Sequence, residues 1–160
     1  MLDSLRGTVL EARPESAVVE TGGFALRIRL PAGATVGLVP GQEVRFYCYL
    51  LFRDEQFLLY GFTSQGQRDL FATLLGVSGL GPEKARTILG VMSPTDVVRA
   101  VERAESRRFQ AVKGIGTRLA ERLVVDLKGK LEEFAAMNLA NSTQPASGSG
   151  ADVVAALLQL

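Results

Sequence analysis

The chain of 160 residues contains no histidine and only one cysteine, Cys48. Without histidine it lacks the side chain that most often serves as a general base or metal ligand, and every histidine-dependent catalytic triad is excluded. A single cysteine cannot form an intramolecular disulfide, and zinc sites of the usual cysteine and histidine types are excluded as well. Cys48 stands in an apolar run, so we expect a small buried hydrophobic residue there.

Other absences narrow the class of protein further. The sequence has no phosphate-binding motif of the form G-x-x-x-x-G-K-[ST], which argues against ATP hydrolysis by this chain. It has neither the apolar N-terminal segment of a signal peptide nor the ~18 consecutive apolar residues that span a bilayer. We therefore expect a cytoplasmic protein without membrane association, cofactor or metal. Carboxylate chemistry with Mg²⁺ is the catalytic class that stays open.

The net charge of +1 is distributed unevenly along the chain. Residues 1–64 hold six Lys and Arg against seven Asp and Glu, whereas residues 65–133 hold twelve against nine. The middle of the chain is therefore basic, which fits a region that meets an anion. A scatter of charges on a neutral surface explains so small an excess equally well.

Residues 1–63 have the pattern of short β-strands. Apolar and polar side chains alternate over residues 24–30, which is the periodicity of a strand. Gly22-Gly23 and Pro40-Gly41 mark turns between strands. Several short strands separated by such turns predict a small barrel of the OB type, with a short sandwich as the alternative.

Two further β-rich runs, residues 43–52 and 57–62, flank the polar segment Arg53-Asp54-Glu55-Gln56. Two acids at the tip of a hairpin are most often only a polar turn. The aromatic residues of this region are expected to fill the barrel core. They are Phe24, Phe46, Tyr47, Tyr49, Phe52, Phe57, Tyr60 and Phe62.

From residue 64 onward the apolar periodicity becomes helical. Ser64-x-x-Gln67 predicts a capping box that opens a helix, and Pro82 and Pro94 stand where first helical positions are expected. The apolar pattern from Leu119 to Phe134 predicts a last long helix.

The end of the chain has a different composition. Residues 137–150 are rich in Ser, Gly, Ala and Asn and predict a flexible linker. Residues 151–160 have the pattern of about three turns of apolar helix, too little to be stable alone. They predict either a segment that docks on a partner or the start of an incomplete C-terminal helical domain. The fold class is thus α+β, with an OB-like barrel over residues 1–63 and a helical domain over residues 64–136.

The helical region repeats itself with an offset of thirty-five residues, which places Gly79-Leu80-Gly81 over Gly114-Ile115-Gly116. The small and apolar residues around the two glycine pairs align without a gap. The aligned pairs are Leu74 with Phe109, Val77 with Val112, Ala85 with Ala120, Ile88 with Leu123, and Leu89 with Val124.

Such a repeat predicts two helix-hairpin-helix motifs that bind a phosphate backbone. The glycines permit unusual backbone angles, and the residue between them, Leu80 or Ile115, points inward. The N–H groups left exposed at the start of the next helix form an anion site that reads no base. Two hairpins together suit both strands of a duplex, whereas a single one could be an ordinary turn. The basic residues expected to extend the contacts are Lys84, Arg86, Lys113, Arg118 and Arg122.

Four motifs keep a fixed order and spacing along the chain. They are Leu5-Arg6-Gly7, Leu59-Tyr60-Gly61-Phe62, Gly79-Leu80-Gly81-Pro82, and Gly114-Ile115-Gly116 with Ala120-Glu121-Arg122-Leu123. Together they resemble RuvA, a family of Holliday-junction-binding proteins, and the resemblance covers residues 1–133. It implies an OB-like barrel, a tandem helix-hairpin-helix domain, a linker and a small C-terminal helical domain.

The resemblance implies a non-catalytic subunit that binds four-way junction DNA as a homotetramer, or as an octamer. The subunit would hold the junction open for a RuvB-type motor ATPase, recruited by the C-terminal domain, and a RuvC-type resolvase is a further implied partner. The processes are homologous recombination, DNA repair and the SOS response. Asp54 and Glu55 would form an acidic pin that keeps the duplex arms apart at the junction centre.

Two other functions compete with this interpretation. A helix-hairpin-helix repair nuclease would use Asp54 and Glu55 with Mg²⁺, although no further catalytic Lys/Asp signature is evident. A scaffold would bind DNA without specificity, or would bind RNA or protein through its barrel. Exposed aromatic residues on the barrel would favour the scaffold.

Two residues depart from the family pattern, which commonly has lysine directly after each hairpin. Glu83 and Thr117 stand there instead, and Lys84 and Arg118 follow one residue later, about 100° further round the helix. Arg122 matches its family position. The implied DNA-binding residues are Gly79, Leu80, Gly81, Lys84, Gly114, Ile115, Gly116, Thr117, Arg118 and Arg122.

Overall fold

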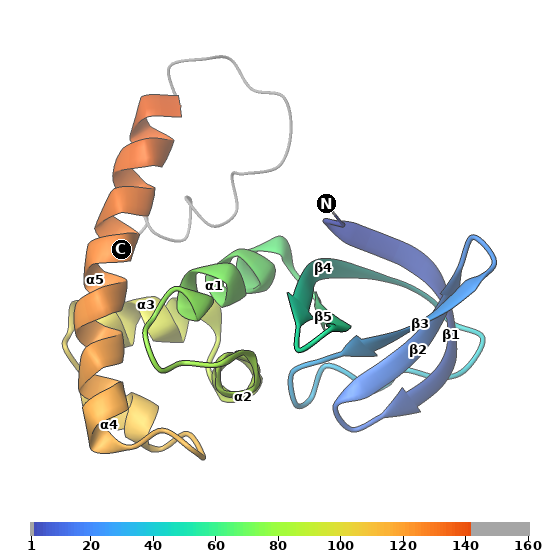
Figure 1. Cartoon of the computed structure of the whole chain (residues 1–160), viewed down its shortest axis with the longest axis horizontal. Coiled ribbons are helices and arrows are strands. Elements are labelled where there is room, and N and C mark those ends of the chain that lie inside the picture. Colours follow the sequence, from blue (N-terminus) through green and yellow to red (C-terminus); the bar gives the residue numbers. More distant parts are fainter. Residues whose placement is uncertain (1, 142–160) are drawn as a thin grey trace. The chain divides into compact units, whose positions relative to one another are not determined.

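The computed structural model in Figure 1 describes residues 2–141, with side chains up to Leu131. Most of the predicted linker and the whole predicted C-terminal helix lie outside the described residues. The chain divides into two compact units. The barrel unit is Met1–Ala72 with Leu89–Val91, and the helical unit is Thr73–Ile88 with the chain from Met92 onward.

The barrel unit is built on a closed barrel of five strands, as the strand pattern predicts (Figure 1). The strand order is β1-β2-β3-β5-β4, and the pairing of β4 with β1 closes the ring. Neighbouring strands are antiparallel except β3 and β5, which are parallel. This is an OB-like architecture, which confirms the expected fold class. The strands are β1 (Ser4–Arg13), β2 (Ser16–Thr21), β3 (Phe24–Arg29), β4 (Glu43–Arg53) and β5 (Gln56–Phe62).

The predicted turns lie where the strands end. Gly22 and Gly23 join β2 to β3, and both have positive φ. The turn therefore needs glycine, which adopts this conformation without steric strain. Pro40 and Gly41 form the turn before β4, closed by a 3.2 Å hydrogen bond from the Gln42 N–H to the Val39 carbonyl. Both turns therefore confirm their predictions.

The glycines of two sequence motifs, Gly7 and Gly61, stand where the barrel has no room for a side chain. A Cβ atom on Gly7 would collide with the carbonyl oxygen of Glu20 on the neighbouring strand. A Cβ atom on Gly61 would collide with the side chains of Ile28 and Leu30. These two glycines serve the packing of the barrel itself.

The barrel core holds fewer aromatic residues than the sequence predicts. Phe24, Phe52 and Phe57 are 70%, 62% and 74% exposed, so the prediction that they fill the core is wrong. Phe24 begins β3 directly after a turn, and Phe52 and Phe57 lie on a part of the β4–β5 hairpin that no third strand covers, because β1 pairs with β4 only as far as Tyr47. Of the eight aromatic residues predicted in this core, Phe46, Tyr60 and Phe62 are buried, and Tyr47 and Tyr49 are half-buried.

Cys48 is buried in the barrel core, as expected, and its N–H donates to the Asp3 carbonyl at 2.8 Å. Burial raises the pKa of the Cys48 thiol to about 11. The thiol is therefore protonated at neutral pH and is a poor nucleophile.

In the part of the chain that the structure describes, the barrel is followed by helices α1 to α5 (Figure 1). Their bounds are α1 (Gln65–Leu75), α2 (Pro82–Val91), α3 (Pro94–Glu102), α4 (Ser106–Gln110) and α5 (Thr117–Asn141). Pro82 and Pro94 begin α2 and α3, as predicted. Within the helical unit, α5 packs against α3 and α4. None of the described helices has the length and apolarity needed to cross a bilayer.

The capping boxes at the starts of α3 and α1 differ in completeness. At α3, Ser93 and Asp96 form a complete capping box, and the Ser93 hydroxyl and N–H hold the pKa of the Asp96 carboxyl below its usual range. At α1, the Gln67 N–H donates to the Ser64 hydroxyl at 3.3 Å, as predicted. The Gln67 side chain, however, accepts from Thr63 rather than from Ser64, so only half of the predicted box forms.

The last helix is longer than predicted. It continues from the expected end at Phe134 to Asn141, into the first residues of the predicted linker. Residues 135–141 contain neither Gly nor Pro and are mostly Ala, Met and Leu, which favour helix. The Gly- and Pro-rich part of the tail begins only after this segment.

Candidate nucleic-acid interface

The helical unit contains two hairpin turns with the same backbone hydrogen bonds. The first hairpin, residues 76–81, leads from α1 to α2, and the second hairpin, residues 111–116, leads from α4 to α5. In the first, the Leu80 N–H donates to the carbonyl of residue 77 at 3.1 Å; in the second, the Ile115 N–H donates to that of residue 112 at 3.1 Å. The repeat in the sequence is therefore a repeat in the backbone.

The side chains that flank the hairpins are buried at matching positions. Leu80 and Ile115 point inward, as predicted, and the alanines of the repeat are fully buried. The carbonyl of Gly81 accepts from the Ala85 N–H at 3.0 Å, and the carbonyl of Gly116 accepts from the Ala120 N–H at 2.9 Å. The other buried positions of the repeat are Leu74, Val77, Ile88, Leu89, Phe109, Val112, Leu123 and Val124.

The four glycines of the hairpins have two different roles. Gly79 and Gly114 have φ of +84° and +87°, a region that other residues rarely adopt, so the turn itself requires them. Gly81 and Gly116 do not have positive φ, and a Cβ atom on either would meet no atom of the described residues within 4 Å. The fold leaves room for a side chain at these two positions. Their glycines instead leave the backbone open to a close ligand.

Each open glycine precedes the first turn of a helix. Gly81 caps α2 without any side-chain hydrogen bond, and Gly116 precedes Thr117 at the start of α5. The first N–H groups of a helix have no intrahelical acceptor, and the helix dipole makes this end positive. The two hairpins therefore present two sites for an anion such as a phosphate.

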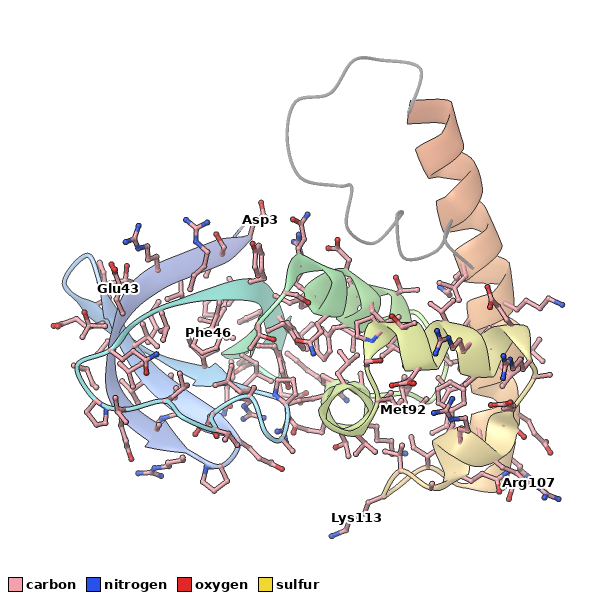
Figure 2. The ribbon with its side chains drawn as sticks, turned by 180° about the vertical axis from the view of Figure 1, so that it is seen from behind. Asp3, Glu43, Phe46, Met92, Arg107 and Lys113 are labelled. Atoms are coloured by element: carbon pink, nitrogen blue, oxygen red, sulfur yellow. The ribbon has the colours of Figure 1, made fainter. Side chains whose placement is uncertain are left out.

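Basic side chains surround the second hairpin. Lys113, Arg118 and Arg122 are exposed, and none forms an ion pair with another residue in the described part of the chain. Lys113 extends outward from the turn between α4 and α5 (Figure 2). Arg107, on the helix that enters this hairpin, also points outward (Figure 2) and was not among the predicted contacts. The pair Arg107-Arg108 was the signal in the sequence that could have indicated it.

The first hairpin has a different charge. Glu83 is exposed in the first turn of α2 and accepts hydrogen bonds from Arg86, from Nε at 3.1 Å and from Nη2 at 2.9 Å. Arg86 is buried, so the prediction that it extends the phosphate contacts is wrong. It lies next to Ala85 on the packed side of the helix, and its charge is taken up by Glu83. Lys84, partly exposed, is the remaining predicted cation of this hairpin.

The acidic turn belongs to the barrel unit. Asp54 and Glu55 form the tip of the β4–β5 hairpin, and both have positive φ, of 51° and 61°. Asp54 is exposed, with Arg53 Nε 3.5 Å from its carboxylate. In the part of the chain that the structure describes, no three His, Cys, Asp or Glu side chains are grouped in a way that would hold a metal ion.

Sequence reasoning missed one feature beside this acidic turn. Phe52 and Phe57 lie opposite each other on β4 and β5, with their ring centroids 4.8 Å apart. The sequence does contain a signal for this pair, since Phe52 and Phe57 each stand two residues from the acidic pair Asp54-Glu55. Alternation alone, however, predicts both phenylalanines in the barrel core.

Comparison with known proteins gives two matches to family models and a set of relatives. Residues 1–61 match the RuvA N-terminal domain, and residues 71–130 match the SAM-like helix-hairpin-helix tandem. A protein of Corynebacterium aurimucosum, named Holliday junction branch migration complex subunit RuvA, is 40% identical over all of this chain and 81% of its own length. Proteins of the same name from Myxococcus xanthus and Leifsonia xyli are 37% and 40% identical. They cover 100% and 82% of this chain, which spans 81% and 63% of their respective lengths.

Proposed function

Because this chain belongs to the RuvA family, we propose that it is the non-catalytic DNA-binding subunit of a Holliday junction branch migration complex. The observation that carries this proposal is the pair of matched hairpins, each with an open glycine before the first turn of a helix. Two such anion sites on one unit suit a ligand with regularly spaced phosphates. Duplex DNA is such a ligand.

The proposed contacts are to the sugar-phosphate backbone and read no sequence. Backbone N–H groups at the two hairpins hold phosphates, and Lys84, Thr117, Arg118 and Arg122 add contacts from their side chains. Binding then depends on the shape of the DNA and on salt concentration rather than on base sequence. Leu80 and Ile115 act indirectly, since they hold the hairpins in place from inside.

The assembly that we propose is a homotetramer around one junction, with an octamer of two tetramers as the alternative. We assign the barrel with its pin to residues 1–63, the DNA-binding domain to residues 64–141, since α5 continues to Asn141, and the linker to residues 142–150. Residues 151–160 then begin the domain that engages a RuvB-type motor ATPase. The complex acts in the cytoplasm, where a RuvC-type resolvase can share the junction.

Asp54 and Glu55 have a different proposed role from the hairpins. Carboxylates near phosphates repel them, so an exposed acidic tip keeps the backbones of neighbouring arms away from the junction centre. The pin therefore contributes to the preference for open junctions and does not contribute to affinity. Its exposed position at the end of a two-stranded hairpin supports this role.

Gel-shift titration of a four-way junction and a linear duplex of the same arm sequence tests the proposal, with Mg²⁺ present and strand lengths checked afterward. We expect tighter binding to the junction and intact strands. Equal affinities would reduce the chain to a general DNA-binding scaffold, and cleaved strands would make it a nuclease. In the same titration, the Asp54→Asn/Glu55→Gln double variant should bind both DNAs at least as tightly as the wild-type chain, with a smaller preference for the junction.

A further inference from the structure

The β4–β5 hairpin has an apolar face that continues beyond the barrel. On one face of β4, Phe46 and Cys48 are buried, and Figure 2 places Phe46 inside the barrel. On the same face, two and four residues further along, Leu50 is 44% exposed and Phe52 is 62% exposed. The apolar face of β4 therefore continues past the end of the barrel core, where its side chains are exposed.

Strand β5 shows the same change from buried to exposed side chains toward the tip of the hairpin. Leu59 pairs with Leu50 and is buried, whereas Phe57 pairs with Phe52 and is largely exposed. The rings of Phe52 and Phe57 contact each other at an interplanar angle of 46°. The end of the hairpin therefore carries two adjoining aromatic rings on one side, directly before an acidic tip.

We propose that Phe52 and Phe57 form a stacking platform for unpaired nucleobases at the centre of the junction. This inference rests on the proposed function, which brings the acidic tip to that centre. Aromatic rings bind unstacked bases through their flat faces and need no particular sequence. The platform would hold bases as they leave one duplex arm and before they enter the next.

The charges around the platform favour a base over a phosphate backbone. Asp54 and Glu55 stand two residues from Phe52 and from Phe57, respectively, and carboxylates repel phosphates, while the faces of the bases carry no charge. Arg53, the basic residue next to Phe52, alternates to the opposite face of β4, and its Nε lies 3.5 Å from the Asp54 carboxylate. The face with the rings is formed by Leu50, Phe52, Phe57 and Leu59. A DNA strand can therefore approach the platform with its bases first.

A contact with a second copy of the chain is a weaker explanation. Two aromatic side chains together offer about 300–500 Å² of surface. A stable protein interface buries roughly 800 Å² on each partner. The ring pair also stabilises its own hairpin, as cross-strand aromatic pairs do, so the test must separate hairpin stability from base binding.

The Phe52→Leu/Phe57→Leu variant keeps apolar side chains on the hairpin but removes both rings. The probe is a four-way junction with two unpaired 2-aminopurine bases at its centre, whose fluorescence is quenched by stacking. We expect the wild-type chain to quench this signal. The double variant should lose the quenching and bind this junction about fivefold more weakly, with unchanged affinity for linear duplex.

Two further variants make the outcome specific. Phe24→Leu replaces another exposed phenylalanine of the barrel unit and should behave as wild type. Phe52→Tyr/Phe57→Tyr keeps both rings and should retain the quenching, even if the leucine variant lowers the melting temperature. Quenching that persists in the leucine variant overturns the platform, and so does a change in its oligomeric state measured by light scattering.

Failure of the platform and failure of the proposed function give different results. If the wild-type chain prefers the junction but the leucine variant matches it in every titration, only the platform is wrong. If the wild-type chain shows no preference for the junction, the proposed function is wrong. A single-stranded 2-aminopurine oligonucleotide then tests the rings alone, and equal quenching by wild-type and leucine chains overturns the platform as well.

Discussion

The two hairpins of the helical unit have the same backbone but opposite charges at the start of the helix that follows. Gly79 and Gly114 have nearly the same φ, and both hairpins close with the same hydrogen bonds. After the first hairpin, however, the first turn of α2 carries Glu83, whereas Arg118 and Arg122 lie exposed on α5 after the second. Packing determines what the two hairpins share, and we expect their contacts with phosphates to differ.

This difference in charge predicts which hairpin contributes more to DNA affinity. A carboxylate in the first turn of a helix is stabilised by the dipole and occupies the region where a phosphate would bind. We therefore expect Glu83 to compete with a phosphate at this hairpin, although its ion pair with Arg86 offsets part of the negative charge. The second hairpin has no such acid in the first turn of α5. We expect the second hairpin to supply most of the affinity.

Aspartate in place of each open glycine should give the largest effect. Asp is a favourable N-cap residue and a Cβ atom has room at both positions, so the fold should be retained. Gly116→Asp should weaken binding to linear duplex by about tenfold or more, because it repels the phosphate and takes over its N–H donors. Gly81→Asp should weaken binding only about threefold, since Glu83 already weakens that site. Fluorescence anisotropy with labelled duplex measures both.

The matched controls are Gly116→Asn and Gly81→Asn, which have the same shape and capping ability without the charge. They should lose less affinity than the aspartate variants, and the difference within each pair reports the electrostatic part. Equal losses for Gly116→Asp and Gly81→Asp would contradict the ranking of the hairpins. Thermal unfolding of all four variants should match that of the wild-type chain.

Glu83→Lys should make the two hairpins more alike. It replaces an acid with the residue that the family commonly has there, and duplex affinity should rise about fivefold. If the new lysine neutralises one phosphate, the slope of log K against log salt should become steeper by about 0.9. Glu83→Gln is the control, because it removes the charge but keeps an acceptor oxygen for Arg86. It should give a smaller increase and no change in slope.

Glu83→Lys is also expected to lower the stability of the fold. Arg86 is buried, and Glu83→Lys removes the two hydrogen bonds that Arg86 donates to Glu83, so the melting temperature should fall. The fall should be smaller for Glu83→Gln. Binding is therefore compared at a temperature where circular dichroism shows both variants fully folded. A slope unchanged from wild type would mean that the first hairpin does not approach a phosphate.

The sequence predicted the hairpins well because their requirements are local. A glycine at positive φ, an apolar residue between two glycines and a small residue in the next helix leave a direct pattern, and two aligned copies make it specific. The role of Gly81 and Gly116 needed the structure, because only coordinates show that a side chain there would meet nothing. Arg86 was misjudged for a similar reason, since sequence alone does not tell which side of α2 is packed.

The exposed phenylalanines were misjudged because alternation shows which face of a strand is apolar, but not where the core ends. Phe52 and Phe57 continue the core face of their strands, and their exposure depends on where β1 stops pairing with β4. That point is set by contacts between strands distant in sequence. Local periodicity therefore predicted the barrel and failed at the tip of its longest hairpin.

Alanine in place of Gly79 or Gly114, the glycines with positive φ, should give the smallest effect. It tests whether the two hairpins have the same backbone conformation. Gly79→Ala and Gly114→Ala should each lower the free energy of unfolding by about 1 kcal/mol, because an L-residue at positive φ is strained. Neither Cβ atom would make a close contact; the nearest is Leu119 Cδ1, 3.8 Å from that of Gly79. The loss should thus come from the backbone alone, and asparagine, which tolerates this conformation, should restore part of it. Urea unfolding followed by circular dichroism should give equal losses for the two alanine variants, whereas unequal losses would show that the hairpins differ in their backbones as well as in their charges.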